Sequence, residues 1–336
     1  MSFIKLFKNL FQIYRYGNFT PWLLSVIVII IFFSCTEEEY QPVKQDPLTI
    51  ERDSVTKSLI SEMNKDTLRL VVKQLENYGT RFALAGNRKT IALSLEERFK
   101  KIGLTDTRID SFRIAPLWQG QQYVEWHYNV SAHLHGKSSP DSLIVIGAHY
   151  DAIATDGNPF ITAPGADDNA SGVSAVFEIA RVMSAKKFRH EYSINFVLFG
   201  AEEFDLAGSK VFAENSKNRG DRISMMINLD MIGYEISTQT AKWKINIINY
   251  PNSLTLMERA YQSCSGYSLL LPVTDNKPSQ SSDSYSFYNK GYRAIYYASP
   301  NTNPNYHSTK DLSAQLNFNY CLEVVKAACA MVIYFN

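Results

Sequence analysis

The chain has 336 residues, of which 45 % are hydrophobic and 20 % are charged. This composition is sufficient for a large buried core, and the length suits one α/β domain once an N-terminal targeting segment is set aside. The formal net charge is only +1, so nothing in the composition indicates a nucleic-acid partner, and we expect none.

Residues 1–34 resemble a signal peptide of the lipoprotein type. Basic residues precede an apolar run over 22–33, which is short for a membrane span and suits a signal-peptide core. The run ends in Phe-Phe-Ser-Cys at Cys35, which resembles a loose lipobox, so we expect cleavage before Cys35 and lipid on its thiol. An uncleaved anchor helix is the alternative. Either route predicts export, with the protein held at the periplasmic or cell-surface side of a bacterial membrane.

Residues 35–53 contain many charges and two prolines, which predicts a solvated linker, and 54–336 are expected to form one folded domain. The cysteines of that domain, Cys264, Cys321 and Cys329, lack Cys-x-x-Cys spacing, which argues against a cysteine-type zinc site. We expect the last two to be buried thiols. Export would permit one disulfide that involves Cys264.

The spacing of apolar residues predicts helices over 54–78 and 87–101, followed by strands over 107–114 and 123–135. Strands and helices then alternate. The further strands are predicted over 142–148, 192–199, 222–229, 244–248 and 293–297, and the further helices over 171–183, 207–215, 254–263 and 318–334. This alternation predicts a single α/β domain with a twisted, mixed, mostly parallel sheet that helices flank on both faces.

Five short segments are rich in metal-binding side chains, and most of them follow a predicted strand. They lie at 147–151, 164–172, 200–203, 228–233 and 306–311. In an open α/β sheet, ligands collect at the carboxyl ends of the strands. Histidines and carboxylates brought together there predict a site for divalent metal ions, and zinc is the metal that this ligand set favours.

His149 directly follows a predicted strand, and Asp151 would lie on the same face of extended backbone. A carboxylate beside a metal-bound histidine can accept its second ring N–H and fix the tautomer. Further along the chain, Asp167, Asp168 and Asn169 crowd together before a predicted helix. Crowded like charges are costly unless a cation relieves them. Helix capping is the alternative role, and one aspartate can bind metal while its neighbour caps.

Glu202 and Glu203 follow an apolar strand, and adjacent carboxylates can point in different directions. One of them can then bind metal while the other moves protons. Asp230 follows another apolar strand, where a helix cap is the alternative role. His307 lies in a loop rich in proline and asparagine, and Asp311 could orient it as Asp151 orients His149.

Taken together and in this order, the five segments resemble the co-catalytic di-zinc aminopeptidase family over about residues 55–335. The superfamily also contains glutaminyl cyclases, glutamate carboxypeptidases and the transferrin-receptor ectodomain. The resemblance implies a fold of the zinc-peptidase, phosphorylase/hydrolase-like type, and it makes 54–336 a zinc aminopeptidase domain.

The resemblance implies two zinc ions held by His149, Asp168, Glu203, Asp230 and His307. Asp168 would bridge them, because the family's bridging aspartate stands four residues before the glycine that is Gly172 here. Glu202 would be the general base, and Asp151 and Asp311 would support the ligands in the catalytic site. The peptide bond after Asp168 would be cis.

Asp283 and Phe287 belong to a segment that resembles the family's substrate pocket. The implied function is a metallo-exopeptidase that removes N-terminal residues from peptide substrates. A glutaminyl cyclase would need one zinc and a tryptophan-lined pocket, and the aminopeptidase-like form of 165–172 argues against it. A carboxypeptidase or dipeptidase would need an arginine for the substrate carboxylate, and Arg293 keeps that alternative open. A binding ectodomain without activity is disfavoured, because every ligand position and the base are filled.

Overall fold

An eight-stranded mixed sheet organises the structure, with the strand order β1-β4-β6-β5-β7-β10-β8-β9. This computed structural model describes residues 47–275 and 279–334. The expected signal peptide over 1–34 and the expected lipid attachment at Cys35 lie outside these residues. Within them, no helix is long and apolar enough to cross a membrane.

The strands β5, β6, β7 and β10 pair in parallel in the middle of the sheet, whereas β1, β4 and β8 join it antiparallel. A separate hairpin is formed by β2 and β3. The strands are β1 (Thr107–Ile114), β2 (Leu117–Trp118), β3 (Gln121–Gln122), β4 (Glu125–Leu134), β5 (Ser139–His149), β6 (Tyr192–Phe199), β7 (Arg222–Leu229), β8 (Lys244–Asn249), β9 (Leu271–Asp275) and β10 (Ala294–Ala298).

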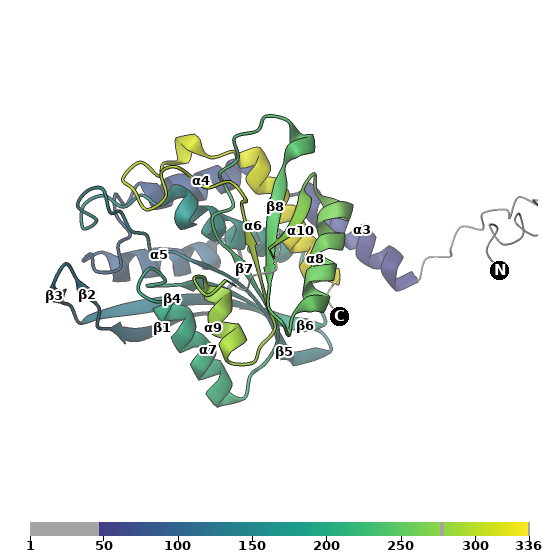
Figure 1. Cartoon of the computed structure of the whole chain (residues 1–336). Coiled ribbons are helices and arrows are strands. Elements are labelled where there is room, and N and C mark those ends of the chain that lie inside the picture. Colours follow the sequence, from purple (N-terminus) through teal and green to yellow (C-terminus); the bar gives the residue numbers. More distant parts are fainter. Residues whose placement is uncertain (1–46, 276–278, 335–336) are drawn as a thin grey trace, which may run out of the picture. The chain divides into compact units, whose positions relative to one another are not determined.

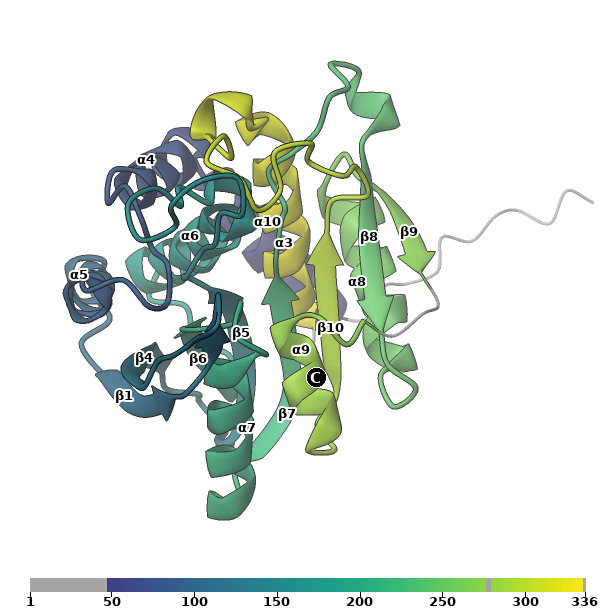
Figure 2. The ribbon, with the colours of Figure 1, turned by 60° about the vertical axis from the view of Figure 1, so that its left-hand side comes forward.

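Helices cover both faces of the sheet (Figures 1 and 2). The helices α4, α6, α8 and α10 pack on one face, and α7 and α9 pack on the other. The helices are α3 (Pro47–Ser61), α4 (Lys65–Glu76), α5 (Arg88–Lys101), α6 (Gly172–Ala185), α7 (Ala207–Arg219), α8 (Leu254–Tyr267), α9 (Asp283–Asn289) and α10 (Phe318–Tyr334), with a π-helix η1 (Ala166–Ser171) and 3₁₀ turns η2 (Thr240–Lys242) and η3 (Ser313–Gln315).

The central strands are buried on both faces, which explains their continuous apolar runs. In β5, Ile144 and Ile146 pack into the core that contains α6, whereas Val145 between them packs into the core that contains α7. Alternate residues of a strand point to opposite faces, so a strand covered on both sides must be apolar throughout. The prediction of an α/β domain with a mixed, mostly parallel sheet is confirmed.

The N-terminal helical region differs from the prediction. Residues 54–78 were expected to form one helix, and the structure has α3 and α4 with a break between them at 62–64. The break follows from a cap, because the Asn64 side chain accepts a hydrogen bond from the Asp66 N–H at 2.8 Å. In addition, α3 begins at Pro47, so 47–53 are helical rather than part of a linker.

The sequence did not predict three short elements, which are the β2–β3 hairpin, β9 and α9. Each is too short for an apolar repeat to distinguish it from a loop. The three cysteines of the domain are free and buried, so none forms a disulfide in this structure.

Replacement of Asn64 by alanine should lower the free energy of unfolding by about 1 kcal/mol, because it removes the α4 cap. Asn64→Asp, which keeps an acceptor oxygen, is the matched control and should remain near the parent value. Urea unfolding monitored by circular dichroism measures both. Equal midpoints for the alanine and aspartate variants would contradict a stabilising cap.

Candidate metal centre

The parallel strands bring the predicted ligands to one edge of the sheet. His149 is the last residue of β5, Glu203 follows β6, and Asp230 follows β7. Asp168 lies in η1 and His307 in the loop after β10. The five side chains come from five separate segments, and only the sheet brings them together.

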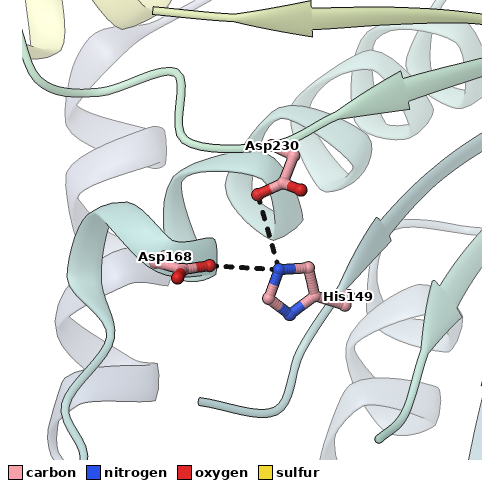
Figure 3. Close-up of side chains that lie close together, drawn as sticks. All are labelled: His149, Asp168 and Asp230. Atoms are coloured by element: carbon pink, nitrogen blue, oxygen red, sulfur yellow. Dashed lines mark ion pairs between the residues drawn. The ribbon is translucent and has the colours of Figure 1, made fainter. Parts of the chain in front are cut away.

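One group of possible ligands is fully inside the protein. The His149 Nε2 atom lies 3.1 Å from Asp168 Oδ1 and 3.4 Å from Asp230 Oδ1 (Figure 3). One ligand atom from each of these three buried residues lies within 4.8 Å of the others. The spacing is close enough for one metal ion to contact all three at ordinary ligand distances of about 2 Å.

A second group shares Asp168 with the first. The His307 Nε2 atom lies 3.1 Å from Asp168 Oδ2 and 2.9 Å from Glu203 Oε2. The carboxylate of Asp168 therefore directs one oxygen to each histidine. Such a shared carboxylate is the arrangement expected of a bridging ligand.

The residues present fit a divalent metal ion. Within the described residues, Glu203 Oε1 is buried and has no hydrogen-bond partner. Buried polar atoms without partners are costly and are rare in native proteins unless something binds them. Imidazole nitrogens combined with carboxylate oxygens are a set that zinc takes readily.

The electrostatics of the cluster are those of crowded, buried carboxylates. Burial, together with the neighbouring Asp168 carboxylate, raises the pKa of Glu203 to about 7. Burial also raises the pKa of Glu202 well above its usual value. Burial acts in the same direction on Asp168, but hydrogen bonds with His149 and His307 hold its pKa below the usual range. A bound cation would stabilise the ionised form of each carboxylate.

Asp151 supports the centre mainly through backbone contacts. Its Oδ1 accepts a hydrogen bond from the Glu202 N–H at 3.0 Å, and its Oδ2 accepts one from the Glu203 N–H at 3.2 Å. The His149 Nδ1 atom lies 3.7 Å from Asp151 Oδ1 and 3.2 Å from the Asp151 carbonyl oxygen. Asp151 thus holds both the histidine and the two glutamates in place.

Asp311 has a different role from the one expected for it. Its carboxylate accepts hydrogen bonds from the backbone N–H groups of Asp167 and Asp168 at 3.0–3.1 Å, and it also accepts one from the Asn303 side chain. Asp311 therefore positions the shared Asp168 rather than His307, because the turn after His307 places it against η1. The His307 ring is instead stacked on the Tyr306 ring, with centroids 3.7 Å apart.

The roles within 167–169 are divided among the three side chains. Asp167 Oδ1 accepts a hydrogen bond from the Gly233 N–H at 2.8 Å, which joins η1 to the loop that carries Asp230. At the start of α6, the Asn169 Oδ1 atom accepts a hydrogen bond from the Gly172 N–H at 2.9 Å. The peptide bond between Asp168 and Asn169 is cis, as the resemblance implies.

A glycine at 172 lets this turn approach β7. A Cβ atom there would lie 2.1 Å from the Leu229 carbonyl oxygen and 2.4 Å from Asn169 Oδ1. These distances are too short for any larger residue. Gly172 therefore sets how closely the Asp168 and Asp230 segments approach each other.

The segment expected to form a substrate pocket supports Asp230 instead. The Ser282 hydroxyl donates to Asp230 Oδ2 at 2.7 Å and accepts from the Asn228 side chain at 2.6 Å. Phe287 is completely buried and packs against Phe199 and Phe212, so the expectation that it lines a substrate pocket is wrong.

Asp283 is also fully buried, and burial raises its pKa to about 7. Its charge also raises the pKa of Glu202. A carboxyl group enclosed in this way is not available to a substrate side chain.

Arg81 is a site residue that the sequence analysis missed. Arg81 is 2 % exposed, and its guanidinium donates to the carbonyl oxygens of Tyr150, Pro164 and Gly165. These carbonyls belong to the two segments that carry His149 and Asp168. No repeat or spacing singles out an arginine that precedes the first predicted ligand by 68 positions, so only the structure could find it.

Arg293 lies far from this centre. It directly precedes β10, and its Nε donates to the Ser224 carbonyl oxygen at 3.1 Å, near the start of β7. Because β7 and β10 are parallel, this position is at the amino ends of the strands, whereas the metal ligands are at the carboxyl ends. Arg293 cannot receive a substrate carboxylate at the metal centre.

An α/β sheet with two overlapping histidine–carboxylate groups at its carboxyl edge defines a metallohydrolase. The chain belongs to peptidase family M28, whose profile matches residues 129–332. That span includes all five predicted metal ligands.

Two curated relatives illustrate the similarity. A "Probable leucine aminopeptidase" of Arthroderma otae is 26 % identical over 296 residues, which cover 83 % of this chain and 75 % of the relative. "Leucine aminopeptidase 1" of Trichophyton equinum is 25 % identical over 322 residues, which cover 90 % and 84 %.

Solved structures share the fold. LapB of Legionella pneumophila superposes with a TM-score of 0.71 at 24 % identity, covering 85 % of this chain and 76 % of LapB. A Bacteroides thetaiotaomicron glutaminyl cyclase bound to N-acetylhistamine gives 0.66 at 17 % identity, covering 82 % and 99 %. Because aminopeptidases and a cyclase share this fold, the fold alone does not select the reaction.

Arg81→Met should lower zinc affinity about 10- to 100-fold, because three buried carbonyls lose their donor and the ligand segments loosen. Arg98→Met is the matched control, since Arg98 lies on α5 and contacts Gln74 and the Phe177 ring instead. Zinc titration against a competing chelator measures both variants. Equal affinities in the two would show that Arg81 does not position the ligands.

Proposed function

We propose that the protein is a zinc-dependent aminopeptidase that uses two zinc ions to remove N-terminal residues from peptides. The observation that carries the proposal is the Asp168 carboxylate, which directs one oxygen to His149 and the other to His307. Membership of peptidase family M28 and the names of the relatives, which include leucine aminopeptidases, support the same activity.

In this proposal, His149 and Asp230 would hold one zinc ion, Glu203 and His307 would hold the other, and Asp168 would be the ligand shared by both. Zinc bound there would polarise the scissile carbonyl and lower the pKa of an attacking water. Each ion would have two ligands of its own and one shared ligand. The free N-terminal amine of the substrate would bind beside one metal position, which explains removal of terminal residues only.

Glu202 is the proposed general base. Its carboxylate lies 3.9 Å from His149 Nε2, so it is beside the ligands without sharing their contacts. It accepts a proton from the attacking water and returns that proton to the leaving amine. The Asp151 carboxylate fixes the backbone N–H groups of both Glu202 and Glu203, so the base and the ligand keep their separate directions.

The glutaminyl cyclase remains the second candidate, because a solved cyclase shares the fold. The second histidine–carboxylate group, of Asp168, Glu203 and His307, favours the two-metal peptidase. The experiment that separates the reactions is a panel of aminoacyl chromogenic substrates, N-blocked peptides and N-terminal glutamine peptides, each with and without chelator. We expect the protein to hydrolyse only the aminoacyl substrates of this panel, and we expect the chelator to abolish that activity.

Glu202→Gln should lower kcat by about 10²- to 10⁴-fold with little change in KM, because it removes the base and preserves the shape of the side chain. Its zinc content should stay near that of the parent. Glu203→Gln is the adjacent comparison and should lose zinc together with activity, because it weakens a ligand. Metal analysis and steady-state kinetics on both variants give the answer.

Two outcomes would contradict these roles. Zinc loss in Glu202→Gln with zinc retained in Glu203→Gln would reverse the assignment of the two glutamates. Full peptidase activity in both variants would refute the mechanism.

We further propose that the chain is exported and anchored in a bacterial membrane by lipid on Cys35. The support is the sequence of 1–39, in which a basic segment, an apolar run and a lipobox-like ending precede an acidic stretch.

Cys35→Ala should abolish lipid attachment and leave an unprocessed precursor or a released protein. Detergent-phase partitioning and mass spectrometry of the mature N-terminus measure this, with Cys264→Ala as a control for loss of a thiol. A mature protein that retains residues 1–34 would instead favour an anchor helix.

A further inference from the structure

A cavity of about 290 Å³ lies at the edge of the domain opposite the metal centre. It is lined by the start of α3 and by the loops that precede β5 and β6. The lining residues are Glu51, Arg52, Val55, Lys137, Lys187, Phe188, Arg189, His190, Glu191 and Ile333. Because β5 and β6 are parallel and end at the metal ligands, the cavity is at their amino ends.

The cavity has a cationic rim and an apolar floor. Arg52, Lys137, Lys187 and Arg189 bring four positive charges, against the two negative charges of Glu51 and Glu191. Within the described residues, no ion pair involves Lys137, Lys187 or Arg189, which are exposed. By contrast, the neighbouring Lys186 pairs with Glu62 at 2.9 Å. The charges of Lys137, Lys187 and Arg189 are therefore not neutralised by an ion pair within the part of the chain that the structure describes.

The backbone holds these cations together. The Lys137 N–H donates to the His190 carbonyl oxygen at 2.9 Å, which fixes the loop before β5 against the loop before β6. Lys187 adopts a φ of +52°, a conformation that favours glycine at the end of a helix. Backbone geometry does not explain a lysine at this position.

The chain leaves the described structure beside this cavity. Glu51, Arg52 and Val55 line it from α3, and α3 begins only a few residues earlier at Pro47. Twelve residue steps separate Pro47 from Cys35, a segment that spans at most about 40 Å when fully extended. A tether at Cys35 would therefore keep this edge of the domain within about that distance of the bilayer surface.

We propose that the cationic rim, defined as Arg52, Lys137, Lys187 and Arg189, docks on the anionic phospholipid headgroups of the membrane that holds the protein. The proposal rests on the membrane tether of the proposed function. Headgroup phosphates attract clustered lysine and arginine residues that lie within a Debye length of the surface, about 10 Å. Between the cations, Val55, Phe188 and Ile333 give the cavity an apolar floor, and the four cations outnumber the two glutamates of the lining.

Docking in this way gives the metal centre a defined direction. The strand β5 runs for eleven residues from the cavity edge to His149, which is about 30 Å at the usual rise per residue. The metal centre then faces away from the lipid, where peptides diffuse freely. A tether alone would leave the domain free to rotate.

The experiment measures which edge of the full-length protein lies at the bilayer. The domain's own cysteines are buried, so an added surface cysteine can be labelled selectively. Ser138→Cys places a fluorophore beside Lys137, and Thr238→Cys places one in the exposed loop after Asp230. The parent chain without an added cysteine gives the background. Quenching of the fluorophore by a lipid-soluble quencher is then measured with two kinds of vesicle. One kind contains neutral phospholipid only, and the other contains about one third anionic phospholipid.

In anionic vesicles, the label at 138 should be quenched several-fold more than the label at 238. The preference should disappear in Lys137→Gln/Lys187→Gln/Arg189→Gln and at high salt. It should persist in Lys89→Gln/Lys242→Gln/Lys244→Gln, which removes the same charge elsewhere. Equal quenching at both positions, an equal preference in neutral vesicles, or no effect of the first triple substitution would overturn the proposal.

Two further readouts separate this proposal from the proposed function. Flotation with neutral vesicles measures attachment through the lipid tether. Hydrolysis of a soluble aminoacyl substrate measures peptidase activity, and both triple variants should retain this activity. If the tether is absent, the protein should still bind anionic vesicles through the rim. The first triple variant should bind them at least tenfold more weakly, because each cation raises the affinity about fivefold. Absence of that salt-sensitive binding would refute the rim.

Discussion

The constraint on which the rest of this structure depends is the burial of several carboxylates at one edge of a sheet. The carboxylates of Asp168, Glu202 and Asp230 all lie near the His149 ring. The Glu203 carboxylate contacts His307, which also contacts Asp168. Ionised carboxylates at such distances repel one another, and burial removes the water that would screen them. The cluster is stable as anions only with compensating positive charge, which a divalent cation supplies and an apolar environment does not.

The surrounding protein fixes the segments that carry these residues mainly through hydrogen bonds to carboxylates. Asp151 and Asp311 are paired with backbone N–H groups, and these bonds fix the segments that carry Glu203 and Asp168. Ser282 gives a hydroxyl to Asp230. Arg81 is the exception, a buried cation whose three bonds go to carbonyl oxygens. The result is a set of ligands whose segments are held in position by hydrogen bonds from the surrounding protein.

The two ends of the parallel strands carry different groups of charged residues. The carboxyl ends carry the carboxylates of the metal centre, and the amino ends carry the rim of Arg52, Lys137, Lys187 and Arg189. The net charge of +1, the balance of 34 basic and 33 acidic residues, gives no sign of this local grouping. In the proposed arrangement, the sheet separates the metal centre from the face that docks on an anionic surface.

The sequence by itself determined the α/β architecture and the five ligand-bearing segments, because apolar periodicity and adjacent metal-binding residues are local signals. Strands β1, β6 and β7 and helix α10 have the bounds that were predicted. Only the tertiary structure decided that Asp311 supports Asp168, that Phe287 is a core residue, that Arg81 joins two ligand segments and that Arg293 is at the wrong edge. These roles depend on contacts between residues distant in the chain, and the direction of a side chain is set by packing and not by its neighbours in sequence.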